Sequence, residues 1–251
     1  MYSTCPKCSY QRQPADTCSV DECPGCGLIF SKWLSNIVEE QGLGSAPGFV
    51  PASNASSGLF RQFLLSPRPG LGNAKLLACL LIWIVFAAWG FSFVLMDFQS
   101  NEIGRSWFHN VDLIFHEAGH VIFQPLGRTL MILGGSLFQV LVPLILMLAF
   151  LIKNRDGFAA SICLWWSGQS LMDVAPYIAD ARALRLPLLG GGTGADSPGM
   201  HDWANLLRPR GWLQYDIRIA SIVDIIGAGV LLIALAWGAY MLYLNCKQRL
   251  G

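Results

Sequence analysis

The feature that most constrains this chain is a set of uncharged apolar segments long enough to cross a lipid bilayer. Residues 76–96, 130–152 and 225–244 contain no Asp, Glu, Lys or Arg. A helix rises 1.5 Å per residue, so about 20 apolar residues cover the hydrocarbon core of a membrane. These segments therefore predict membrane-spanning helices and exclude an ordinary soluble domain.

Two further apolar segments lie between them. Residues 107–123 are apolar with a few ionisable positions, and the uncharged residues 158–172 continue through Asp173 to Ala179. The sequence thus predicts an all-α, multi-pass membrane protein with about five transmembrane helices. The composition agrees, with 53% hydrophobic and 13% charged residues, and a net charge of +1 predicts no nucleic-acid partner.

The opening of the chain predicts a separate small module. Cys5-Pro6-Lys7-Cys8 and Cys23-Pro24-Gly25-Cys26 are separated by fourteen residues, a spacing typical of a zinc ribbon in which four thiolates hold one structural zinc. A module of this size has too little core to fold without the metal. The alternative is a pair of disulfides. Reduced thiolates would place the ribbon in the cytosol.

Three regions follow from this pattern. We expect the zinc ribbon at residues 1–40, a flexible linker rich in Gly, Ser, Pro and Ala at residues 41–74, and a membrane domain at residues 75–251. Arg61, Arg68 and Lys75 precede the first span, which agrees with a cytosolic N-terminus. A ribbon of this kind is also a candidate surface for a protein partner.

The segment with the clearest chemistry is His116-Glu117-Ala118-Gly119-His120. Two histidines four apart project from one face of a helix, so both imidazoles can bind one zinc ion, while Glu117 reaches a water on that ion. Ionisable groups in an apolar membrane helix are costly and usually functional. We therefore predict a catalytic zinc bound by His116 and His120, with Glu117 as the general base.

A catalytic zinc usually has three protein ligands, so one more ligand is needed. The candidates are Asp173, Asp180, His201, Asp202 and Asp224. Asp112, four residues before His116, is a candidate hydrogen-bond acceptor for that imidazole. The small residues Gly134, Gly135 and Ser136 predict close approach of another helix.

These residues carry a family resemblance. The His116–His120 motif, a following helix with glycines, and a later helix with Asp173, Pro176 and Asp180 resemble the site-2 protease family of intramembrane zinc metalloproteases. The resemblance covers residues 107–180. It implies that the two histidines and Asp180 bind zinc, with Asp173 as a nearby polar residue. The chain departs from the family pattern at Asp173, where the family has asparagine, and at Ala181, where a glycine is usual.

The function expected from the sequence is a multi-pass zinc metallopeptidase that cleaves transmembrane or membrane-proximal segments of a protein substrate by metal-activated water. It would use one catalytic and one structural zinc. Two alternatives are a catalytically silent zinc-binding scaffold that recruits a partner through its ribbon, and a zinc hydrolase acting on lipid. We expect the motif helix and the fourth apolar helix to run parallel through the bilayer, with a re-entrant motif helix as the alternative.

Overall fold

The computed structural model describes residues 4–13, 16, 18–19, 21–33, 64–65 and 72–250. The chain divides into two compact units, Met1–Asn54 and Ala55–Gly251. Almost all of the predicted linker, residues 41–74, lies outside the described residues.

In the first unit, the two Cys-x-x-Cys segments form matching turns. The N–H of the first cysteine in each turn donates to the carbonyl five residues later, which is Tyr10 for Cys5 and Leu28 for Cys23, at 2.8 and 2.9 Å. One antiparallel bridge closes each turn, Thr4↔Gln11 and Glu22↔Ile29. The two halves of the motif therefore share one local geometry.

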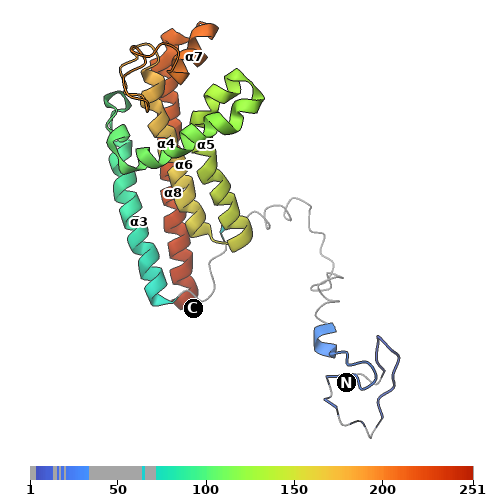
Figure 1. The fold of residues 1–251 in the computed structure, drawn as a ribbon. Helices are drawn as coiled ribbons and strands as arrows, with labels where there is room; N and C mark the ends of the chain where they lie inside the picture. Colours follow the sequence, from blue (N-terminus) through green and yellow to red (C-terminus); the bar gives the residue numbers. More distant parts are fainter. Residues whose placement is uncertain are drawn as a thin grey trace, which may run out of the picture. The chain divides into compact units, whose positions relative to one another are not determined.

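The second unit is built from helices (Figure 1). In chain order they are α3 (Asn73–Val94), η1 (Phe98–Ser100), η2 (Ile103–Arg105), α4 (Trp107–Phe123), η3 (Gln124–Leu126), α5 (Arg128–Ala149), η4 (Phe150–Asn154), α6 (Gly157–Ala179), α7 (Asp202–Leu207), η5 (Arg208–Arg210), η6 (Leu213–Tyr215) and α8 (Asp216–Leu250). Each of the five predicted apolar segments is helical, as α3, α4, α5, α6 and α8.

Three helical stretches are long and apolar enough to cross a membrane. They cover Asn73–Val94, Arg128–Asn154 and Leu213–Gln248, and so correspond to α3, α5 with η4, and α8 with η6. The motif helix α4 has only 17 residues. Most residues of α6 are buried inside the protein. The predicted helical class is confirmed, and three of the five predicted spans are long and apolar enough to cross a membrane.

Helix α6 forms the centre of the unit, packed against α8 and flanked by α3. A Cβ atom on Gly168 of α6 would lie 2.7 Å from Leu231 N and 2.8 Å from Gly227 O of α8, so the two backbones touch. Trp165 of α6 fills the space beside Gly90 of α3. These contacts make α8 antiparallel to α3 and α6, as Figure 1 shows.

The local sequence sets both ends of α4. Ser106 caps its N-terminus by accepting the N–H of Phe108 at 3.2 Å. Pro125 lies in the short η3 turn that follows, and Gly127 has φ +95, a conformation that favours glycine. Helix α4 therefore ends at Phe123, about one turn after His120.

Small residues allow α4 and α5 to cross in direct backbone contact. A Cβ atom on Gly119 of α4 would overlap the carbonyl of Gly134 in α5, and a Cβ on Gly134 would lie 2.8 Å from Gly119 O. The close approach predicted for Gly134 and its neighbours is confirmed. It fixes the second half of α4 on α5.

The direction of α4 differs from the expectation. Figure 1 shows α4 lying across α3, α6 and α8 rather than running alongside α6. Phe108 near its start packs on Trp165 of α6, with ring centroids 5.4 Å apart, while its second half packs on α5. The reason is that the helix is short and its glycine contact lies on α5.

Candidate metal centres

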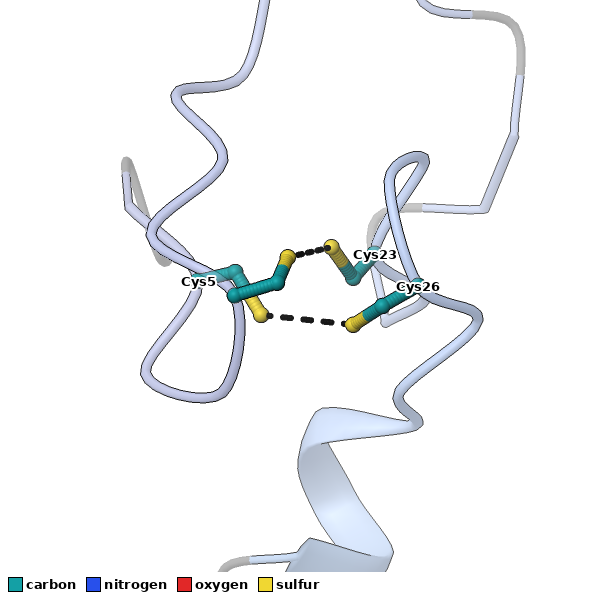
Figure 2. A group of neighbouring side chains, drawn as sticks. Cys5, Cys23 and Cys26 are labelled. Atoms are coloured by element: carbon teal, nitrogen blue, oxygen red, sulfur yellow. Dashed lines mark hydrogen bonds between the residues drawn. The ribbon is translucent and has the colours of Figure 1, made fainter.

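The four ribbon cysteines form a metal-binding group in the first unit. Their sulfur atoms all lie within 4.8 Å of one another, with Cys5 Sγ 3.7 Å from Cys26 Sγ and Cys8 Sγ 3.7 Å from Cys23 Sγ (Figure 2). Sulfurs bound tetrahedrally to zinc at about 2.3 Å are about 3.8 Å apart. All four cysteines are free thiols. The geometry fits a four-thiolate metal site and not the alternative of two disulfides.

Backbone groups favour the thiolate form, which a metal requires, at Cys5 and Cys8, but the neighbouring cysteines raise the pKa of Cys8 to about 12. Burial alone would raise the pKa of Cys5. The backbone N–H groups of Cys8 and Lys7, together with the neighbouring thiols, have the larger effect and lower this pKa to about 6. Cys5 and Cys23 pack under Phe30. Cys18 also belongs to this unit, but it lies outside the group of four cysteines.

The second group lies in the membrane unit and consists of His116, His120 and Asp202. The two histidines come from one face of α4, as their spacing predicted, and Asp202 is the first residue of α7. Asp202 Oδ2 lies 3.1 Å from His116 Nε2 and 3.2 Å from His120 Nε2. Three metal-ligand atoms from two distant segments therefore meet at one point.

Hydrogen bonds at the far side of each ring determine which nitrogen faces this point. His120 Nδ1 lies 2.8 Å from the carbonyl oxygen of Met131, which can only accept, so this nitrogen carries the proton. His116 Nδ1 lies 2.8 Å from Gln139 Oε1, and the Gln139 amide nitrogen donates to the Ser170 carbonyl at 3.4 Å. In its neutral form, each ring would therefore present an unprotonated Nε2 toward Asp202, as a metal ligand requires.

The donor set fits a zinc ion. Two nitrogen lone pairs and a carboxylate oxygen repel one another at this distance unless a proton or a metal ion lies between them. Nitrogen and oxygen ligands at about 2.0–2.1 Å from a tetrahedral zinc are about 3.3 Å apart, close to the separations found here. Three protein ligands also leave one position for water, which is the pattern of a catalytic site.

Contacts from three helices hold Asp202 in place. His201 caps α7 by accepting the N–H of Ala204 at its Nδ1, at 3.2 Å, and the Asp202 N–H donates to the Tyr177 hydroxyl at 3.0 Å. The next residue, Trp203, donates to Ser136 Oγ of α5 at 3.1 Å. The start of α7 is therefore tied to both α5 and α6.

Asp180, the third ligand implied by the family resemblance, is not in this group. Its two carboxylate oxygens accept the backbone N–H groups of Arg185 and Leu186, each at 2.9 Å, and one lies 3.4 Å from His201 Nε2. The structure thus places Asp202, one of the alternatives, beside the histidines. Asp180 instead organises the loop that leads toward α7.

The remaining candidates have other contacts. Asp112 is fully buried and accepts the Trp166 indole N–H at 2.8 Å, so it is not the partner predicted for His116. Asp173 lies 3.0 Å from His109 Nδ1. His201 is buried, which lowers its pKa, and it stacks on Tyr177 with ring centroids 4.3 Å apart. Asp224 on α8 is half-buried and lines neither cavity described for this unit.

Sequence reasoning missed three groups that position the site. Gln139 is a polar residue in an apolar segment, but the sequence alone did not identify it as the partner of His116. An isolated glutamine in such a segment is a usable signal, because its amide must find a partner in lipid. The Met131 carbonyl and the Tyr177 hydroxyl carried no comparable signal.

A large cavity opens onto the metal group. It has a volume of about 790 Å³ and is lined by His116, Glu117, His120 and Asp202, together with loop residues that include Leu186, Pro187 and Leu188. Pro187 forms an antiparallel bridge with Thr193, so the loop folds back on itself at this point. Glu117 therefore faces the same space as the ligand atoms without belonging to the ligand group.

Gly135 provides a sharp test of the metal group. A Cβ atom there would lie 2.6 Å from both His116 Nε2 and His120 Nε2, so Gly135→Ala should displace the ligand nitrogens. We expect metal affinity of the membrane unit to fall by about 10- to 100-fold, as when ligand orientation is lost. Metal analysis of the purified chain measures this. Gly229→Ala, where the added Cβ meets open space, should retain the metal; equal affinity in both variants would contradict the assignment.

Comparisons of this chain with protein-family models, curated proteins and solved structures found no match.

Proposed function

We propose that this chain is a membrane-embedded zinc metallopeptidase that cleaves transmembrane or membrane-proximal segments of other proteins. The observation that carries the proposal is the convergence of His116, His120 and Asp202 at a cavity that Glu117 also lines. The resemblance of the His116–His120 segment to site-2 proteases supports the same reaction class. The metal set differs from that family because Asp202 replaces Asp180.

The residues of the cavity have distinct roles in this proposal. A zinc ion in such a site supplies Lewis acidity, which lowers the pKa of water and polarises a carbonyl group. Glu117 accepts a proton from the attacking water and returns it to the leaving amine. Gln139 and the Met131 carbonyl keep both Nε2 atoms available by holding the Nδ1 protons.

The proposal favours a peptide substrate over a lipid because the His116–His120 motif with Glu117 is typical of metallopeptidases. The loop residues Leu186, Pro187 and Leu188 line the cavity and offer an apolar surface to the side chains of a bound segment. A transmembrane helix must unwind locally before a peptide bond is exposed to attack. The cavity volume of about 790 Å³ is sufficient for several residues of an unwound segment.

Metal removal tests the function. The full chain, purified in detergent and mixed with single-span membrane proteins, should cleave a subset of them, lose cleavage on chelation and recover it when zinc is added back. The cleavage products should be mapped by mass spectrometry. If the reloaded protein, with both metals bound, cleaves none of these proteins, hydrolysis of lipid would favour the lipid hydrolase. Capture of a partner through the ribbon would instead favour the scaffold.

The topology we propose has four spans, α3, α5, α6 and α8, with α4 entering the membrane without crossing it. This is supported by the three long apolar helices, by α6 packed among them, and by α4 lying across the bundle. The start of α3 and the end of α8 then share one side, with Lys75 and Lys247 near it. The loop around Gly192 faces the other side.

Cysteine accessibility tests this topology. The native cysteines outside the ribbon are first replaced by serine, and a single cysteine is then introduced at Lys75 or at Gly192. The two introduced cysteines should react with a membrane-impermeant thiol reagent from opposite sides of the membrane. With the ribbon in the cytosol, Gly192→Cys should be labelled from outside. Labelling of both positions from the same side would favour five spans instead.

A further inference from the structure

Three arginines line a second cavity beside the metal cavity. This arginine cavity has a volume of about 400 Å³ and contains Arg128, Arg208 and Arg210, with no Asp or Glu among its lining residues. Among the described residues, Arg128, Arg208 and Arg210 form no ion pair with a carboxylate. The cavity therefore concentrates positive charge without an internal counter-charge.

The sequence brings these arginines together from two segments. Arg128 begins α5, directly after Gly127, and the first turn of α5 contains no acidic residue. Arg208 and Arg210 form η5, and the Arg210 guanidinium is fixed by donating to the Leu206 carbonyl. Guanidinium groups bind the oxygens of a phosphate through paired hydrogen bonds, so this arrangement suits a phosphate group.

Exposed apolar side chains lie close to the arginines in the sequence. Leu126 and Leu130, on either side of Arg128, are 60% and 39% exposed, and Trp212, just after Arg210, is 52% exposed. Arginine and tryptophan beside exposed leucines are typical of the membrane–water interface, where apolar side chains face acyl chains and cations face headgroups. This setting favours a lipid over a soluble phosphate compound.

We propose that the arginine cavity binds the phosphate headgroup of an anionic phospholipid. Arg128, Ile132 and Asn205 line both this cavity and the metal cavity, so the bound lipid lies at the entrance to the metal site. The proposal rests on the membrane location of the chain. It does not depend on peptide hydrolysis, and binding can be measured in a catalytically silent protein.

Native mass spectrometry tests the proposal. The full chain in detergent is mixed with equal amounts of phosphatidylglycerol and phosphatidylcholine that carry the same acyl chains. We expect preferential retention of phosphatidylglycerol. Arg208→Gln with Arg210→Gln should weaken that retention by about tenfold or more, the factor that loss of a charge-assisted hydrogen bond produces. Arg128→Gln, a single change at an exposed position, should weaken it in the same direction if the double variant fails to fold.

The matched control is Arg185→Gln with Arg218→Gln, which removes the same charge from exposed positions outside the arginine cavity. This control should retain phosphatidylglycerol as the unmodified chain does. Equal loss in both double variants would overturn the proposal in favour of general charge attraction. The proposal would also be overturned if inorganic phosphate bound as tightly as phosphatidylglycerol. The same conclusion would follow if an acidic peptide bound through Arg208 and Arg210 while the chain showed no preference for phosphatidylglycerol over phosphatidylcholine.

Discussion

Replacing Asp202 with alanine is expected to empty the metal site of the membrane unit while the ribbon keeps its metal. Asp202 Oδ2 lies 3.1 Å from His116 Nε2 and 3.2 Å from His120 Nε2, and no other carboxylate joins this group among the described residues. Loss of a group that only orients a ligand lowers metal affinity by about 10- to 100-fold, so loss of a ligand should cost more. Metal analysis should fall from two zinc ions per chain to one.

Asp180→Ala is the matched comparison, because the family resemblance implies Asp180 as the ligand. Its carboxylate binds the backbone of Arg185 and Leu186, so its loss should loosen the loop and lower the unfolding temperature while the metal stays bound. Cys5→Ser with Cys8→Ser should give the converse of Asp202→Ala, losing only the ribbon metal. Metal retained in Asp202→Ala but lost in Asp180→Ala would establish Asp180 as the third ligand.

Replacing Glu117 with glutamine should leave both metals bound and slow cleavage by about 10²- to 10⁴-fold. Glu117 lines the metal cavity but is not one of the three ligands, and glutamine has nearly the same shape but cannot accept a proton. The loss should appear in the rate of the chemical step, measured with enzyme in excess over substrate, and not in substrate binding. Metal content and unfolding temperature of the variant should match those of the unmodified chain.

The control for Glu117→Gln is Glu102→Gln, which removes a carboxylate from an exposed position outside the cavity. It should cleave at the unmodified rate. A Glu117→Gln variant that retains the full rate would exclude Glu117 as the proton acceptor. If that variant also supports the cellular role of the protein, the scaffold function gains support over the peptidase.

Short-range patterns in the sequence were sufficient for the parts of the sites that lie within one local element. The four ribbon cysteines and the pair His116 and His120 could be assigned because turn geometry and helical periodicity fix their mutual positions. The glycine contact between α4 and α5 was predictable for the same reason, since Gly134 can serve only where another backbone comes close. The α-helical class and three apolar spans followed from segment length and hydrophobicity.

Only the tertiary structure decided which distant groups complete the metal site. Asp180 and Asp202 were both candidates from the sequence. The choice between them depends on how residues 181–201 fold back, with the Asp180 carboxylate binding loop N–H groups and α7 docking through Trp203. The partners Gln139 and Met131 likewise depend on the crossing of α4 over α5. Sequence periodicity fixes neighbours within a helix, whereas contacts between segments depend on packing over the whole unit. The sequence therefore determined the chemistry available to this protein, and the fold determined which carboxylate joins it.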